Sequence, residues 1–147
     1  MKRTLIALAT GCLLLTGCSQ VKEEQTFTGA VQYVGNADRI YTSDKECTFA
    51  GHSVKDGDGV LLRGSDDRIL GKSTLDVIKM EGLDQGRGVC HFAAVFTDIV
   101  SGDSAYQAEL TGLGTEVFTE DELEKRTAVS DLLKNWIEVG LSQGSGR

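Results

Sequence analysis

The sequence predicts a mainly-β domain with one short helix near its C-terminus. Several short stretches alternate apolar and polar side chains, which is the period-two pattern of half-buried strands. Glycine is frequent, at 18 of 147 residues, and proline is absent, so glycine, Asp and Asn would form the turns between strands. A capping-box motif that begins at Thr119 marks the start of the helix.

Alternation is clearest in residues 89–96, where Cys90 and Phe92 lie on one face with Ala94 and Phe96. The opposite face is also fairly apolar, so this strand is predicted to lie centrally in its sheet. Residues 104–110 alternate cleanly, with Tyr106, Ala108 and Leu110 facing inward. Other strands are predicted over residues 27–34, 39–42, 47–51, 59–63, 68–72 and 74–80.

Turn signals separate these strands at residues 35–38, 55–59 and 64–67. The Asp-Gly pairs of residues 55–59 supply the positive φ angles that a tight turn needs. Residues 64–67 are flanked by two predicted strands and indicate a hairpin. Cys47, Phe49 and Gly51 are expected to share one face.

The helix is expected to start near Glu120, because Thr119 can accept a first-turn N–H and Glu122 can reach back to it. Leu123, Leu132, Leu133 and Trp136 are candidates for its buried side. Residues 136–141 alternate apolar and polar side chains and are predicted as a last strand, with a helix that continues to Gly140 as the alternative.

The N-terminus has the layout of an export signal. Lys2 and Arg3 precede an apolar run over residues 5–15, which is too short to span a bilayer as a helix. Residues 15–18 read Leu-Thr-Gly-Cys, the bacterial lipobox pattern, which predicts cleavage after residue 17 and a lipid on Cys18. An ordinary signal peptide without lipid is the alternative, but the A-x-A-like cleavage site that it needs is missing.

The predicted domain organisation follows from this cleavage: a signal peptide at 1–17, a polar tether at 18–26, a β domain at 27–142 and a disordered tail at 143–147. The mature chain carries 13 basic and 22 acidic side chains, a formal charge of −9. That charge disfavours nucleic acid and anionic lipid headgroups. The lipid on Cys18 would therefore be its attachment to the cell membrane, on the extracytoplasmic side.

Cys47 and Cys90 are the two cysteines that remain besides Cys18, and in an oxidising compartment they are expected to form a disulfide. A zinc site formed with His52 and His91 is the alternative. Cys90 and His91 are adjacent in a predicted strand and would point to opposite faces, which argues against that site. No cofactor or metal is predicted.

Residues 47–123 resemble a family of small secreted or lipid-anchored actinobacterial proteins of uncharacterised function. The resemblance depends on the order of several short motifs, and it implies an immunoglobulin- or transthyretin-like β-sandwich with one disulfide. The motif residues are Cys47 and Gly51, Val60 and Leu62, Leu70, Gly71 and Leu75, Cys90 and Phe92, Gly102, Tyr106 and Glu109, and Phe118, Thr119 and Leu123.

Two other chemistries are weaker interpretations. Asp56 and Asp58 fit the first positions of a calcium loop, but Val60 occupies the third and Asp67 replaces the final Glu, so a solvated turn is favoured. A hydrolase would need an activated nucleophile, and residues 51–55 lack the final glycine of a G-x-S-x-G elbow around Ser53.

The sequence therefore predicts a non-enzymatic, lipid-anchored binding or structural module of the cell envelope, whose partner is an envelope protein or a cell-wall component. A prophage-encoded lipoprotein that masks a receptor and excludes other phage is an alternative in the same class. A metal-assisted hydrolase that uses His52 and His91 is the enzymatic alternative and requires the two imidazoles to meet in one pocket.

Overall fold

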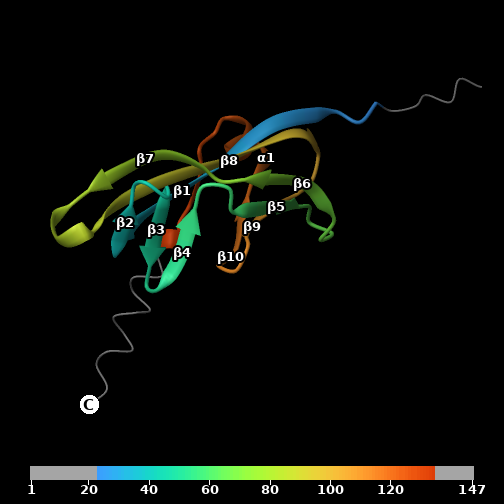
Figure 1. The fold of residues 1–147 in the computed structure, drawn as a ribbon. Helices are drawn as coiled ribbons and strands as arrows, with labels where there is room; N and C mark the ends of the chain where they lie inside the picture. Colours follow the sequence, from blue (N-terminus) through green and yellow to red (C-terminus); the bar gives the residue numbers. More distant parts are fainter. Residues whose placement is uncertain (1–22, 135–147) are drawn as a thin grey trace, which may run out of the picture.

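A computed structural model describes residues 23–134, which form a mainly-β sandwich with a short α-helix near the end of the described chain (Figure 1). The predicted fold class is confirmed. The signal, Cys18 and the predicted last strand at 136–141 lie outside the described residues.

The longest strands form one four-stranded sheet, called here the long sheet. Its strand order is β11-β1-β8-β7. The central pair, β1 and β8, is antiparallel and extends from Thr26 opposite Val100 to Ala37 opposite Gly88. The last strand of the described chain, β11, lies parallel to β1. The bounds are Thr26–Ala37 for β1, Asp76–Gly82 for β7, Gly88–Val100 for β8 and Ala128–Ser130 for β11.

Two smaller sheets complete the fold. One has four strands in the order β10-β9-β5-β6, and the other has three in the order β2-β3-β4. The four-stranded one contains β5 (Gly59–Arg63), β6 (Ile69–Thr74), β9 (Tyr106–Leu110) and β10 (Gly114–Phe118). The three-stranded one contains β2 (Arg39–Tyr41), β3 (Glu46–Phe49) and β4 (His52–Lys55).

The smaller sheets cover different halves of the long sheet's inner face (Figure 1). Near the start of β1, the four-stranded sheet packs on the long sheet. The contact is close there, since a side chain on Gly71 of β6 would meet the ring of Phe96. Toward the other end, the three-stranded sheet packs on it, and a side chain on Gly35 would meet Phe49 and Leu133. Each of these glycines therefore permits two layers to approach closely.

The buried core follows the alternation predicted for the two clearest strands. On β8, Cys90, Phe92, Ala94 and Phe96 are all buried, and β8 is flanked by β1 and β7 as its predicted central position requires. On β9, Tyr106, Ala108 and Leu110 are buried. The hairpin around residues 64–67 is also confirmed, because β5 pairs antiparallel with β6.

Two local predictions are wrong, and some short strands are missed. Residues 35–37 are not a turn, because β1 continues through them and Asn36 pairs with Val89 of β8. Gly51 is not on the strand of Cys47 and Phe49; it lies in a turn with φ of 85°, where glycine is the least strained residue. The strands β4, β10 and β11 are not predicted by the sequence pattern.

The helix starts as predicted but is short. In α1, Glu120–Glu124, the Thr119 side chain accepts the Glu122 N–H and the Glu122 side chain accepts the Thr119 N–H. Leu123 is its buried residue. Arg126 takes a left-handed conformation with φ of 58°, and the chain then pairs with β1 as β11. Leu132 and Leu133 therefore lie beyond α1, in a separate helical segment that begins at residue 132, and Trp136 lies outside the described residues.

Candidate functional site

A disulfide joins Cys47 of β3 to Cys90 of β8, as predicted. Its sulfur atoms are 1.95 Å apart, its Cα atoms are 6.7 Å apart, and both residues are fully buried. The bond connects the three-stranded sheet to the central strand of the long sheet. Both thiols are therefore used in a covalent bond and do not serve as thiolate ligands for zinc.

The two histidines lie in different sheets. His52 is exposed on β4, next to Ser53, whose hydroxyl donates to Glu46 at 2.7 Å. His91 is on β8, with Nε2 3.9 Å from a carboxylate oxygen of Glu81 on β7. Within residues 23–134, no three His, Cys, Asp or Glu side chains are grouped in a way that could hold a metal ion.

The acidic segment considered for calcium is a turn. The Asp58 carboxylate accepts the Lys55 N–H at 2.9 Å, and that of Asp56 accepts the Val77 N–H at 3.0 Å. The Val77 hydrogen bond, together with Lys45 3.5 Å away, lowers the pKa of Asp56. These carboxylates thus stabilise the β4–β5 turn and the start of β7, as the solvated-turn interpretation predicts.

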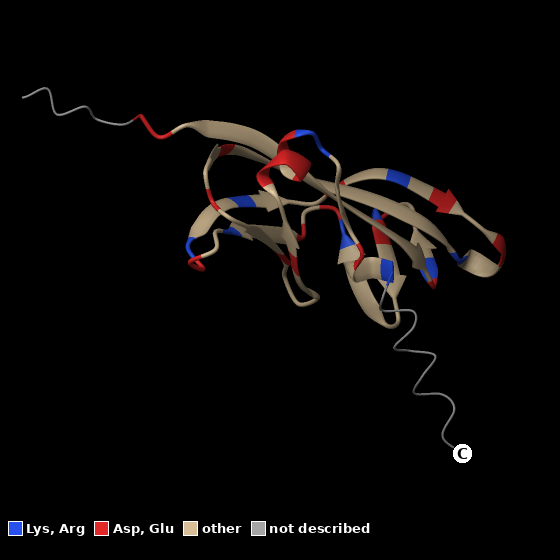
Figure 2. Cartoon of the chain, turned by 180° about the vertical axis from the view of Figure 1, so that it is seen from behind, with Lys and Arg blue, Asp and Glu red and all other residues tan. Residues whose placement is uncertain are grey.

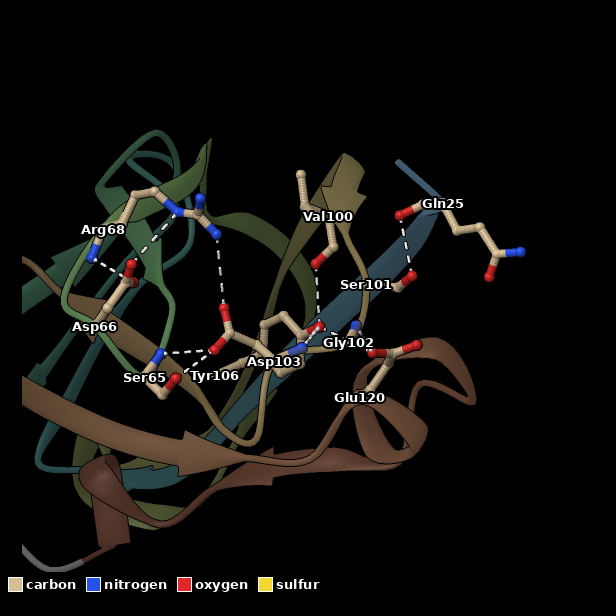
Figure 3. Close-up of polar contacts among 10 residues, drawn as sticks. All are labelled: Gln25, Ser65, Asp66, Arg68, Val100, Ser101, Gly102, Asp103, Tyr106 and Glu120. Carbon is tan, nitrogen blue, oxygen red and sulfur yellow. Dashed lines mark hydrogen bonds and ion pairs between the residues drawn. The ribbon is translucent and has the colours of Figure 1, made fainter. Parts of the chain in front are cut away.

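A polar cluster occupies the end of the molecule where β1 begins (Figure 3). Its centre is the hydroxyl of Tyr106, which lies 2.9 Å from Glu120 Oε2 and 3.1 Å from the Val100 carbonyl, and which accepts the Asp103 N–H at 3.3 Å. Burial and the Glu120 hydrogen bond raise the pKa of Tyr106 to about 12. The ring of Tyr106 also packs edge-on against Phe27, with 5.6 Å between centroids.

Asp103 connects this cluster to the β5–β6 hairpin. Its carboxylate accepts both the hydroxyl and the N–H of Ser65 and lies 4.0 Å from a guanidinium nitrogen of Arg68. The Ser65 hydrogen bonds lower the pKa of Asp103. The loop between β8 and β9 is therefore fixed on two sides, by the hairpin and by α1.

The same loop holds the chain just before β1. The Gln25 carbonyl accepts the N–H of Ser101 at 2.9 Å and its hydroxyl at 3.0 Å (Figure 3). The next residue, Gly102, donates its N–H to Glu120 at 2.8 Å. The point at which the predicted tether enters the domain is thus attached to both the loop and the helix. We call this end of the molecule the tether end.

A pocket lies at the opposite end, called here the tip, where β1 ends and the β7–β8 hairpin turns. It has a volume of about 400 Å³. The hairpin turn is the short 3₁₀ segment Asp84–Gly86. The lining combines apolar, amide and charged side chains: Asn36, Ala37, Asp38, Leu83, Arg87 and Gly88.

Charged side chains are distributed unevenly over the domain (Figure 2). The helix α1 has four acidic residues among its five positions, whereas β1 carries no charged side chain. At the tip, Arg87 forms no ion pair within residues 23–134. Near the tether end, Arg68 and Lys125 are paired with carboxylates.

Sequence reasoning did not find this pocket. The sequence predicts a turn at residues 35–38 and no element over residues 83–88. Only the pairing of Ala37 with Gly88, at the far end of the β1–β8 ladder, brings the two segments together. No local pattern carries that information.

Comparison of the chain with protein-family models, with curated proteins and with solved structures finds no match. The resemblance of residues 47–123 to the actinobacterial family therefore stays a prediction. Over the described residues, no helix has the length and apolar content to cross a membrane.

Proposed function

We propose that this chain is a lipid-anchored protein of the cell envelope that acts by binding an envelope protein or a cell-wall component, without catalysis. The observation that carries the proposal is the buried Cys47–Cys90 disulfide, combined with the lipobox cysteine Cys18. Disulfides of this kind persist in extracytoplasmic compartments and are rare where thiols are kept reduced.

The position of the first strand supports an anchor at the tether end. Residues 18–25, between Cys18 and β1, could span at most about 29 Å when fully extended. The Gln25 carbonyl is held by Ser101, so the domain would be attached to the membrane at one defined end. The twelve residues of β1 then extend about 36–40 Å from that end. The tip would face away from the bilayer.

The experiment is intact mass spectrometry of the protein purified from membranes, before and after reduction with alkylation. We expect a chain that starts at Cys18 with added acyl mass, and two thiols that are labelled only after reduction. A Cys18→Ser variant is the matched control and is expected to lose the acyl mass and to leave the membrane fraction. An unacylated wild-type chain would overturn the anchor.

In this experiment, thiol labelling reports on the disulfide and the added mass reports on the anchor, so the two are tested separately. If Cys47 and Cys90 are labelled without reduction in the membrane-derived protein, the proposed oxidising location is wrong even when acyl mass is present. If they are protected but acyl mass is absent, the protein is exported without an anchor.

A further inference from the structure

The floor of the tip pocket includes Gly88, where a side chain would overlap neighbouring atoms. A Cβ atom on Gly88 would lie 2.0 Å from Ile40 Cδ1 and 2.2 Å from the Glu81 carbonyl oxygen. The Ile40 side chain of β2 and the Glu81 backbone of β7 therefore pack directly on Gly88, and Asn36, Leu83 and Arg87 are among the residues that line the pocket with it. Its volume of about 400 Å³ is in the range of small-ligand sites.

The two charged side chains of this pocket, Asp38 and Arg87, differ in whether they already have a partner within the domain. A carboxylate oxygen of Asp38 accepts the Ala50 N–H at 2.5 Å. Arg87, in contrast, has no ion pair within residues 23–134, although the chain has an excess of acidic side chains. An unpaired guanidinium offers a fork of N–H donors that matches the two oxygens of a carboxylate.

The apolar residues of the lining indicate which other group the ligand would carry. Leu83 is 60% exposed at the hairpin, and Ala37 is buried beside Gly88. An exposed leucine next to a pocket offers a surface for a small aliphatic group. The Asn36 amide can donate a hydrogen bond to a polar group of the same ligand.

We propose that the tip pocket binds the carboxylate end of a peptide whose terminal side chain is small and aliphatic. Arg87 pairs with the carboxylate, and the exposed Leu83 side chain contacts the aliphatic group. This inference deepens the proposed function, on which it rests for the orientation of the tip away from the membrane. Two sources share this chemistry: the C-terminus of an envelope protein and the end of a cell-wall peptide.

The test uses the mature protein in detergent micelles, labelled with ¹⁵N and titrated with N-acetyl-L-alanyl-L-alanine or N-acetyl-D-alanyl-D-alanine. We expect saturable shifts of the amide signals of Asn36, Leu83 and Gly88 with one of these acids. The matching C-terminal amides are expected to bind about tenfold more weakly or worse, because they lack the charge that pairs with the guanidinium. Preference for the D,D form indicates a wall peptide, and preference for the L,L form a protein C-terminus.

Arg87→Gln is expected to weaken binding of the acid about tenfold or more and to remove the difference between acid and amide. Arg39→Gln is the matched control. Arg39 is also an exposed arginine without an ion pair in the described chain, and it lies nearby on β2 but does not line the pocket. The proposal is overturned if the acid and the amide bind equally, or if the Arg87→Gln variant binds the acid like wild type. It is also overturned if no amide signals shift at a 20-fold excess of ligand over about 1 mM protein.

The titration does not depend on acylation, because each variant is compared with wild type in the same preparation. A chain that lacks the lipid but binds the acid through Arg87 would overturn the anchor and support the pocket. An acylated chain that does not bind the acid would support the anchor and overturn the pocket.

Discussion

The Tyr106 hydroxyl lies 2.9 Å from Glu120 Oε2, and the same carboxylate oxygen accepts the Gly102 N–H at 2.8 Å. One side chain of the helix therefore fixes both a buried tyrosine and the loop that holds the tether end. Tyr33 is also fully buried, but its hydroxyl has no hydrogen-bond partner within residues 23–134. The two tyrosines allow a direct comparison.

We expect Tyr106→Phe to lower the free energy of unfolding by about 1–2 kcal/mol, because Glu120 and the Asp103 N–H lose a partner. Tyr33→Phe is expected to leave stability unchanged or to increase it, because it removes a buried polar atom that makes no hydrogen bond. Urea denaturation of both variants measures the difference. Equal losses in the two variants would contradict the assigned hydrogen bonds.

Acid should weaken the contact between the β8–β9 loop and the β5–β6 hairpin. The Ser65 hydrogen bonds lower the pKa of Asp103 below its ordinary 3.8, so the folded state binds this proton more weakly than the unfolded state. The stabilisation is complete above the ordinary pKa and is lost as the pH falls through the lower folded value. We expect unfolding free energies below pH 4 to decrease less in Asp103→Asn than in wild type.

The Asp103 pKa itself can be followed by carboxyl ¹³C NMR. Ser65→Ala removes the hydroxyl that contributes most to the shift and should move this pKa back toward 3.8. Ser104→Ala is the control, because Ser104 acts on Asp103 through its backbone N–H. An unchanged pKa in Ser65→Ala would show that the Ser65 hydroxyl does not hold the carboxylate.

Removal of the disulfide tests how strongly it stabilises the sandwich. The bond closes a separation of 43 residues, which corresponds to about 4 kcal/mol in the chain-entropy model. We expect the Cys47→Ala/Cys90→Ala variant to unfold at a correspondingly lower urea concentration. Wild type in reductant should match it, and a loss below about 1 kcal/mol would mean that packing alone holds the two sheets together.

The floor of the tip pocket can be tested with a paired glycine. Gly82 and Gly88 are opposite each other in the β7–β8 ladder, but only Gly88 faces atoms that a side chain would overlap. Gly88→Ala is expected to cost about 1–3 kcal/mol by overpacking, and Gly82→Ala less than about 0.5 kcal/mol. Comparable effects of the two substitutions in thermal unfolding would contradict this packing.

Sequence reasoning found the elements whose patterns are local. The alternation of β8 and β9 predicts their buried faces, and Thr119 and Glu122 predict the start of α1, because these signals arise within a few neighbouring residues. The disulfide is also predictable, because the predicted export signal would leave one pair of cysteines besides Cys18.

The elements that were missed depend on distant partners. β4 contains one buried residue, Val54, in a polar segment, and β11 has only three residues. Residues 36–37 favour a turn locally, yet pairing with β8 extends β1 through them. The tip pocket was missed for the same reason, because its two sides are set by the far end of that ladder.

The parallel pairing of β1 with β11 has a consequence for when the chain can fold. The Gln32 side chain bonds to the Arg126 carbonyl, 94 positions away, and Val31 pairs with Ala128. Pairing over such separations is slow, because loop-closure entropy is lost before any contact is gained. The β1–β11 pairing can therefore form only after residues 128–130 have left the ribosome, whereas β1 can pair with β8 earlier. Under the proposed export, the start of the chain would reach the membrane before the long sheet is complete.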